Sequence, residues 1–581
     1  MKFKRILAAI LATAMIISLF ACDGGTGSES NGVNDSDHTN STSATDGIED
    51  STTNNSSSAD ETVKDNEATE NETETEVEPD MDKLSQGTVI LKYGYTQSVI
   101  NGTVTDTFNK NEAPIRDGGE TYISSYFLLE QFNVFADDAV VKFDGVEFLP
   151  IITLKEFGFF IFEDVDNELI LIAENEPDFA SDEEEFAFLR ESNNMLAIGD
   201  KKIDASIKTN RPVLFTTDEE INNAKAMALQ GKEPWASTIA SVKSRADAAI
   251  SEGAQPYTGR SATEYRLAAC KDMINAHYMA LSYRYTEDTK YLNGAVDFLL
   301  AYAKPKLGTD EYLDYSKATT DGQADIGLNI AAPLTTACEV YSLLYTSINS
   351  NDKKVIEGWI KDEVELTIKG HQFWIQNDYY DQQYGNNHLT SHLMGIIAGA
   401  YVLENNKYLT YALTEKNNPA YFAEMIDRAI LMEGDDVWPG DTDSDFRPGE
   451  IYDRYRVVST PSNGFGYSLY HMKFMTNCAL MLYNNGYNYF DYIGKNGENL
   501  KISYKVYTEY LIQNDATLYG GHYTGNSLNR ENAYSMYAMA YYIYGDETIK
   551  SVLDAFKAQK ISCMENELFG ISALYLFGYE D

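Results

Sequence analysis

The chain is 581 residues long, is 43% hydrophobic and carries 90 acidic against 45 basic side chains, a formal net charge of -45. At roughly 100 to 200 residues per domain, this length leaves room for two to four domains whose cores need no disulfide or metal. The charge argues against nucleic acid as a partner, because no basic stripe is present to neutralise phosphates. No apolar run of about 18 residues recurs after the N-terminus, which excludes a polytopic membrane protein.

The first 22 residues are typical of a targeting segment. Basic residues precede an apolar stretch from Ile6 to Phe20 that is too short for a membrane-spanning helix, so we interpret 1–22 as a secretory signal. The stretch ends in Leu-Phe-Ala-Cys, which resembles a bacterial lipoprotein signal with Cys22 as the lipidated residue. The resemblance implies an extracellular lipoprotein anchored through Cys22 to a cell membrane; plain secretion is the alternative.

Residues 23–84 are rich in Asp, Glu, Ser, Thr and Asn and contain almost no large apolar side chain. Such a segment cannot bury enough surface to offset the entropy of ordering, so we expect a disordered acidic tether. From 85 to 175, short runs of Val, Ile, Phe and Tyr are separated by Asn-Gly and Asp-Gly turn signals. This pattern predicts a small β-rich α+β domain, followed by a connector over 176–209.

The predicted β-rich domain contains an internal repeat. Two segments, beginning at Arg116 and Lys142, each run as a Gly turn, a strand, an apolar helical turn and a final strand. The repeat is similar to the copper amine oxidase N-terminal-like domain, and implies a spacer or surface-binding module without copper or oxidase chemistry.

From about 210 to 581 the pattern becomes helical. Thr217 followed by Glu220 has the spacing of a capping box and predicts a helix N-terminus. Beyond it, an apolar helix dense in Ala, Tyr and Met, a brief polar turn and a Tyr-led second helix recur, over 279–299, 399–413, 478–493 and 539–556. Repeated helix hairpins bury their apolar faces on one another, so we expect a mainly α fold, an (α/α) toroid. The cysteines of this region have no CxxC spacing, and we expect buried thiols at Cys270, Cys338, Cys478 and Cys563.

Two polar segments interrupt the helical pattern. Asn386, Asn387 and His388 lead into a helix of small residues, and Tyr470 with His471 lies in another. Just before the first segment, Trp374 and Tyr384 flank a polar, irregular stretch. Their aromatic faces suit the apolar faces of sugar rings; the alternative is that these rings close a loop onto the helices.

At these two segments the chain resembles the alginate lyase family of polysaccharide lyases, over roughly 210–581. The family's Asn-Asn-His segment is matched by Asn386, Asn387 and His388, and the second half of its Arg-Gly to Tyr-His segment is matched by 468–471. The resemblance implies cleavage of a uronic-acid-containing polysaccharide, alginate or a similar polyuronate, by β-elimination.

The resemblance also implies roles for individual residues. It assigns Tyr470 as the acid, with the role of base as a second option, and His388 as the base or as the group that neutralises the substrate carboxylate. The family's Arg falls on Asn463, so we take Arg454 as the catalytic cation, the alternative being a surface ion pair with Asp453 or Glu450. Remaining substrate contacts are expected from Asn386, Trp374, Tyr384, His471, Arg447 and Arg456.

These residue types suit the chemistry of elimination. Removing the C5 proton places negative charge beside a carboxylate, which the enzyme must stabilise as the charge grows. The amide of Asn387 can donate a hydrogen bond to that carboxylate, and an Arg can supply countercharge. No cofactor or metal is required, and the seven histidines show no HExxH-like spacing.

Two other functions remain open from the sequence. An inverting glycoside hydrolase on an (α/α) toroid would use two separated carboxyl groups, drawn from Asp325, Asp378, Asp381 or Glu450. A noncatalytic surface glycan-binding lipoprotein would keep the aromatic residues and lack the chemistry.

Overall fold

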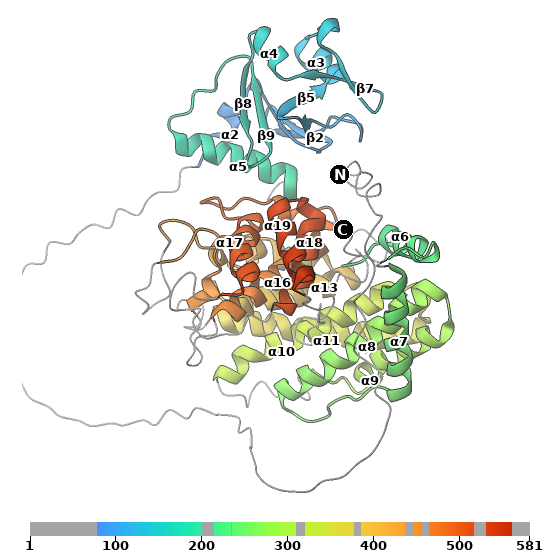
Figure 1. The fold of residues 1–581 in the computed structure, drawn as a ribbon. Coiled ribbons are helices and arrows are strands. Elements are labelled where there is room, and N and C mark those ends of the chain that lie inside the picture. The colour runs from blue at the N-terminus through green and yellow to red at the C-terminus, as the bar shows by residue number, and fades with distance from the viewer. Residues whose placement is uncertain are drawn as a thin grey trace, which may run out of the picture. The chain divides into compact units, whose positions relative to one another are not determined.

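The computed structural model describes residues 78–199, 214–233, 235–309, 320–376, 385–435, 445–455, 464–515 and 530–559, except for the side chains of 320–325, 417 and 531–532. The expected signal with Cys22, and the expected tether up to residue 77, lie outside these ranges. The described residues confirm the fold class as mainly helical, with a small β-rich domain before the helices (Figure 1).

The β-rich domain contains two antiparallel sheets. Their orders are β3-β2-β1-β9-β8 and β4-β5-β7-β6. The strands are β1 (Thr88–Lys92), β2 (Gln97–Ile100), β3 (Thr103–Asp106), β4 (Ile115–Asp117), β5 (Glu120–Ser124), β6 (Val141–Phe143), β7 (Val146–Pro150), β8 (Phe160–Asp164) and β9 (Leu169–Ala173). A short helix, α2 (Met81–Leu84), precedes them, and the 3₁₀ helix η1 (Asp137–Ala139) precedes β6.

The repeat in this domain forms two strand-and-helix units. Strand β5 leads directly into α3 (Ser125–Phe132), and β7 leads into α4 (Ile152–Glu156). The central strands β1 and β9 are buried along their whole length, because their side chains alternate between two cores. Leu91 and Ile170 pack with α3, whereas Ile90 and Leu171 pack with a further helix, α5.

Helix α5 (Asp182–Ile198) occupies half of the segment 176–209 that we expected to be a connector. Its start follows ordinary capping chemistry, because the Ser181 side chain accepts a hydrogen bond from the Glu184 N–H and the first turn is acidic. One side covers the first sheet through Phe188 and Leu189. The amide of Asn194 donates to the carbonyl of Ile493, in the helical region. The segment predicted as a connector therefore contains a regular helix that packs on the first sheet.

The helical region begins at the predicted capping box, which the structure confirms between Thr217 and Glu220. Its first helices are α6 (Asp218–Leu229), α7 (Trp235–Glu252), α8 (Ala262–Thr286), α9 (Thr289–Ala303), α10 (Thr320–Leu344) and α11 (Ser350–Ile375). The later ones are α13 (Asn387–Val402), α14 (Asn406–Leu413), α15 (Phe422–Ala429), α16 (Gly464–Tyr483), α17 (Leu500–Gln513), α18 (Glu531–Tyr544) and α19 (Glu547–Ala558). The 3₁₀ helices η3 (Glu415–Asn417), η4 (Tyr452–Tyr455) and η5 (Tyr489–Asp491) stand between some of them.

These helices form an inner and an outer layer, the arrangement of an (α/α) toroid. Helix α10 packs between α8 and α13, α13 packs on α16, and α16 packs on α18. The outer partners include α7, α9, α11, α14, α17 and α19. All residues of α13 are buried, as its small and apolar sequence requires of an inner helix.

Neighbouring inner helices run parallel. A Cβ added at Gly327 of α10 would lie 2.4 Å from Nε2 of His392, and one added at Gly395 would lie 3.1 Å from the Ala331 Cα. The residue further along α10 meets the residue further along α13, so the two helices run in the same direction. The absence of a side chain at each glycine allows the close approach. Parallel neighbours bring the N-termini of α10, α13 and α16 to one end of the array.

The structure contains a helix hairpin in three of the four segments for which one was predicted. The segment 478–493 differs, because α16 is followed by a turn and by η5 rather than by a full second helix, and α17 begins only at Leu500. Cys270, Cys338 and Cys478 are buried free thiols, as expected, and Cys563 lies outside the described residues. Within the described ranges, no helix combines the length and the apolar character needed to cross a bilayer.

Candidate active site

A buried carboxylate joins the two polar segments that the sequence singles out. Oδ2 of Asp453, on η4, accepts a hydrogen bond from the backbone N–H of Asn387 at 3.0 Å and lies 2.8 Å from Nδ1 of His471. The other ring nitrogen of His471 lies 2.6 Å from the hydroxyl of Thr390, on α13. This chain of contacts fixes the first turn of α13 against the first half of α16.

The first turn of α13 positions His388 from two sides. The Asn386 side chain caps the helix by accepting a hydrogen bond from the His388 N–H at 2.9 Å. The Trp374 ring stacks on the imidazole with the ring centroids 4.5 Å apart and the planes 20° from parallel. Asn386 and Trp374 are both buried. The structure therefore gives them contacts that hold the helix start and the imidazole, whereas we expected them to contact substrate.

Asn387 presents a polar atom to this end of the helix array. Its side chain is 3% exposed, and its Oδ1 has no hydrogen-bond partner among the described residues. A buried amide oxygen without a partner costs about 1–3 kcal/mol, so such an atom usually has a functional reason. A ligand hydroxyl that donates a hydrogen bond would satisfy this oxygen, while the amide NH2 of the same side chain can donate to an acceptor.

Tyr470 and His471 are neighbours on α16 with different surroundings. Successive helical side chains point about 100° apart, so one can enter the core while the next faces outward. His471 is fully buried, whereas Tyr470 is half-buried, with its ring centroid 6.2 Å from that of Tyr467. The structure thus makes His471 a support inside the protein, where we expected a substrate contact, and leaves Tyr470 accessible.

Arg454 is in the interior. Its guanidinium donates a hydrogen bond to Oε2 of Glu450 at 2.7 Å and another to the carbonyl of Asp445 at 3.0 Å, and both charged side chains have zero exposure. Burial raises the pKa of Glu450, and the Arg454 charge acts in the opposite direction. The alternative of a surface ion pair is wrong, because this pair is buried. A role in holding η4 now explains the contacts of Arg454 better than contact with substrate.

The other expected residues are placed as follows. Arg447 lies 3.5 Å from the carboxylate of Glu509 at the surface. Glu450, one of the hydrolase candidates, is held by Arg454 and by the Tyr510 hydroxyl at 2.5 Å. Tyr384, Arg456, Asn463, Asp378 and Asp381 lie outside the described residues, and the side chain of Asp325 is not described.

Three residues of this site were missed in the sequence analysis. Asp453 was considered only as a possible ion-pair partner of Arg454, and Thr390 gave no signal, because a single Asp or Thr in a helical region has no distinctive spacing. Gly464 is the third: a Cβ there would lie 2.0 Å from the backbone carbonyl oxygen of Arg454, so the start of α16 touches the backbone of η4. A glycine at the predicted start of a helix was the available hint of close approach.

Within the described ranges, no three or more His, Cys, Asp and Glu side chains come together as a metal site would require. The two segments supply an amide, imidazoles and a phenol, and the Asp453 carboxylate joins them by contacting the Asn387 backbone and the His471 ring. These groups can donate hydrogen bonds to an anion and transfer protons.

Comparisons with known proteins find one matching family and several similar solved structures. Residues 225–435 match the family described as Alginate lyase. No curated protein matches the chain. Similar solved structures include an alginate lyase from Bacteroides ovatus, at 14% identity and a TM-score of 0.43, covering 64% of this chain and 100% of that one.

Two further similar structures are variants of alginate lyase A1-III complexed with tetrasaccharide. A Tyr-to-Phe variant has 12% identity and a TM-score of 0.45, covering 65% of this chain and 99% of that one. A His-to-Ala variant has 13% identity and a TM-score of 0.41, covering 62% and 94%. The match of residues 225–435 to the Alginate lyase family supports the assignment of the chain as a polysaccharide lyase.

Proposed function

We propose that this protein cleaves a uronic-acid-containing polysaccharide, alginate or a similar polyuronate, by β-elimination at the N-terminal end of α13 and α16. The observation that carries the proposal is the link through Asp453, which binds the Asn387 backbone and lies against the His471 ring. It holds Asn387 and His388 against the helix that carries Tyr470.

In this proposal Asn387 and His388 act on the substrate carboxylate. Negative charge moves onto that carboxylate as the C5 proton leaves, and fixed hydrogen-bond donors in a water-poor site stabilise it most at that moment. The side-chain amide of Asn387 supplies N–H donors. His388 is held by stacking on Trp374, so its ring needs little reorganisation during the reaction.

Tyr470 transfers the proton in this proposal. It donates to the glycosidic oxygen as the bond to C4 breaks, and either its phenolate or His388 removes the C5 proton. A phenol has an ordinary pKa of about 10, so service as the base requires positive charge nearby. The half-buried Tyr470 hydroxyl on α16 suits the acid role directly, because a phenol is protonated at neutral pH.

The decisive experiment distinguishes elimination from hydrolysis. Elimination leaves a C4=C5 double bond that absorbs ultraviolet light, whereas hydrolysis releases reducing ends without new absorbance. The purified protein is incubated with alginate, polygalacturonate and glycosaminoglycans. Absorbance that rises together with reducing ends supports the lyase; reducing ends alone indicate the inverting hydrolase, and neither product indicates a noncatalytic glycan-binding protein.

Tyr470 has a matched control one turn earlier on the same helix. Tyr470→Phe removes one oxygen, and turnover should fall by at least about a hundredfold, the scale of losing a general acid or base. Tyr467→Phe removes the same oxygen from a neighbour that is also half-buried, and turnover should stay close to that of the unmodified protein. Equal activity in both variants would contradict the assignment of Tyr470.

Attachment to a membrane through Cys22 is a separate proposal, supported by the lipoprotein-like signal in the sequence. Cells that express the full chain are labelled with a fatty-acid probe. Label that disappears in Cys22→Ser supports the anchor. Unlabelled protein released equally from both strains contradicts it. The β-rich domain would then stand between the anchor and the catalytic region as a spacer or surface-binding module.

A further inference from the structure

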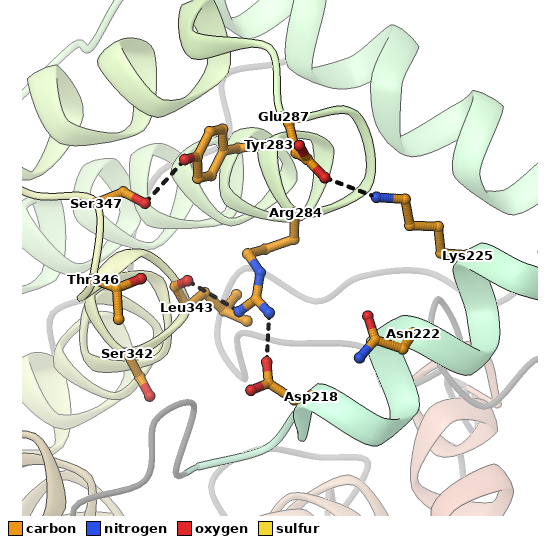
Figure 2. Close-up of a pocket in the computed structure, with 10 residues that line it drawn as sticks. All are labelled: Asp218, Asn222, Lys225, Tyr283, Arg284, Glu287, Ser342, Leu343, Thr346 and Ser347. Carbon is orange, nitrogen blue, oxygen red and sulfur yellow. Dashed lines mark hydrogen bonds and ion pairs between the residues drawn. The ribbon is translucent and has the colours of Figure 1, made fainter.

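A polar cavity of about 310 Å³ lies between α6 and the ends of α8 and α10. Figure 2 shows Arg284 reaching between Asp218 on α6 and the backbone of Leu343 on α10. Its volume falls at the lower end of ligand pockets, about 300–1,000 Å³. The walls are formed by Asp218, Asn222, Lys225, Tyr283, Arg284, Glu287, Ser342, Leu343, Thr346 and Ser347.

The cavity is remote from the candidate active site. Gly327 of α10 stands level with His392, near the N-terminal end of α13. Leu343 lies further along the same helix by about 24 Å, at a rise of about 1.5 Å per residue. The cavity therefore lies toward the C-terminal ends of α8 and α10, whereas the active site lies at the N-terminal ends of α13 and α16.

Two ion pairs leave the cavity without net charge. Arg284 donates a hydrogen bond to Oδ1 of Asp218 at 2.5 Å, and Lys225 lies 3.3 Å from Oε1 of Glu287. The acid side chains stay largely in solvent, since Asp218 is 57% and Glu287 80% exposed. Figure 2 draws one ion pair at each of these carboxylates, and a carboxylate this exposed can accept further hydrogen bonds from a ligand.

Neutral polar groups complete the walls. Asn222 and Thr346 are exposed, and Figure 2 shows no interaction between them and the other residues drawn. The Tyr283 hydroxyl lies 2.9 Å from the Ser347 hydroxyl, which leaves the half-buried Tyr283 ring at the edge of the cavity. The cavity thus offers an amide, hydroxyls, carboxylate oxygens and one aromatic ring within a small space.

We propose that this cavity binds a neutral saccharide unit. A sugar has vicinal hydroxyls that both donate and accept, and it matches walls that contain donors and acceptors side by side. An anion would meet Lys225 and Arg284 only by competing with Asp218 and Glu287, which already neutralise them. A neutral polyol can bind without separating either ion pair.

The site goes beyond the proposed lyase activity and does not depend on it. A neutral sugar held here would add a second point of attachment to a mixed polysaccharide. Two linked contacts raise the apparent affinity, because the second binding step becomes intramolecular. The same attachment would arise if the distant site proved to be a hydrolase or a binding surface.

The test uses the full chain and titration calorimetry with neutral pentasaccharides of glucose, mannose and galactose, and with an oligouronate of the same length. We expect at least one neutral sugar to bind. Asn222→Ala combined with Thr346→Ala should weaken that binding about tenfold, as two lost hydrogen bonds allow, with an unchanged thermal midpoint. Both positions are exposed, so folding should not be affected.

Asn223→Ala is the matched control, because Asn223 is the exposed neighbour on α6 that does not line the cavity. Its neutral-sugar affinity should equal that of the unmodified protein. The proposal is overturned if no neutral pentasaccharide binds, if the double variant binds as the control does, or if the double variant loses affinity for the oligouronate alone. Loss of lyase activity in Tyr470→Phe with normal neutral-sugar binding would separate the two sites.

Discussion

The buried pair of Arg454 and Glu450 makes a sharp prediction about stability. Arg454→Ala removes the countercharge from a carboxylate that has zero exposure. Leaving one partner of a buried ion pair uncompensated costs about 3–5 kcal/mol. At about 2.1 cal/mol/K of unfolding entropy per residue, a helical region of about 370 residues loses roughly 1.3 °C of thermal midpoint per kcal/mol, so the variant should unfold roughly 4–7 °C below the unmodified protein. Calorimetry at pH 7 measures this directly.

A double variant provides the control. Glu450→Gln combined with Arg454→Met removes both charges and keeps similar volumes, and uncharged replacements of buried pairs are often neutral or stabilising. It should therefore be more stable than Arg454→Ala alone. The deficit of Arg454→Ala should also shrink as the pH falls, because protonating Glu450 removes the unpaired charge. That carboxyl already has a raised pKa from burial.

The same measurement separates two roles for Arg454. A positioning residue that holds η4 should lose stability and activity together, with part of the activity restored in the stable double variant. A cation that contacts substrate would lose turnover at an unchanged thermal midpoint, and the double variant would stay inactive. The second result would refute the reasoning from burial and restore Arg454 as the catalytic countercharge.

Three further predictions concern the packing around the site. Asp453→Asn keeps one acceptor and loses the carboxylate charge that strengthens the contacts to Asn387 and His471. Because a charge-assisted hydrogen bond contributes about 1.5–3 kcal/mol, turnover on a uronan should fall at least tenfold, while the hydrodynamic radius stays unchanged. Gly464→Ala should lower the unfolding free energy by about 1–3 kcal/mol through its clash with η4, whereas Gly466→Ala, with open space around it, should be neutral or stabilising in denaturant titration. Burial lowers the pKa of His277 to about 4 and of His392 to about 3 from the ordinary 6.5, so both are neutral when folded. The unfolded state binds protons on these histidines below a pH of about 6.5, whereas the folded state does so only near 4 and 3. The stability that the neutral rings confer is therefore complete above a pH of about 6.5 and is lost as the pH falls towards 4 and 3. Thermal midpoints should drop over that pH range, and the drop should be smaller in His392→Phe.

The sequence predicted those parts of the fold that depend on local patterns. The capping box at Thr217 and Glu220 was found because two side chains at a fixed spacing satisfy two backbone N–H groups. The hairpins of α8 with α9 and of α18 with α19 were found because apolar faces recur with short polar turns between them. Helix α5 was missed, although Ser181 and the acidic turn after it mark its start. Helix α5 has few apolar residues on one face, and only the sheet that it covers explains why it folds as a helix there.

The site was predictable as segments but not as an arrangement. Asn387, His388 and Tyr470 were predicted as site residues through a resemblance of short motifs, and their roles remain a proposal. The contacts that hold them come from residues distant in sequence: Trp374 beside His388, and Asp453 beside Asn387. Those contacts depend on how the ends of different helices are placed against one another in the fold. The periodicity of a single segment contains no information about that placement.

The polar contacts between α13 and α16 are easier to explain by function than by stability. Buried carboxylates and imidazoles lose more solvation than they regain unless each is fully hydrogen-bonded, and apolar side chains of similar size would pack between these helices at lower cost. Asp453, His471 and Thr390 nevertheless occupy the fully buried interior. What they provide is direction: each contact fixes an angle as well as a distance, so the turn that carries Asn387 and His388 is held relative to α16. A site that stabilises charge at one position in the transition state needs that fixed direction. The same interior polar atoms that weaken the packing can thus hold the proposed catalytic groups in a fixed position and orientation relative to one another.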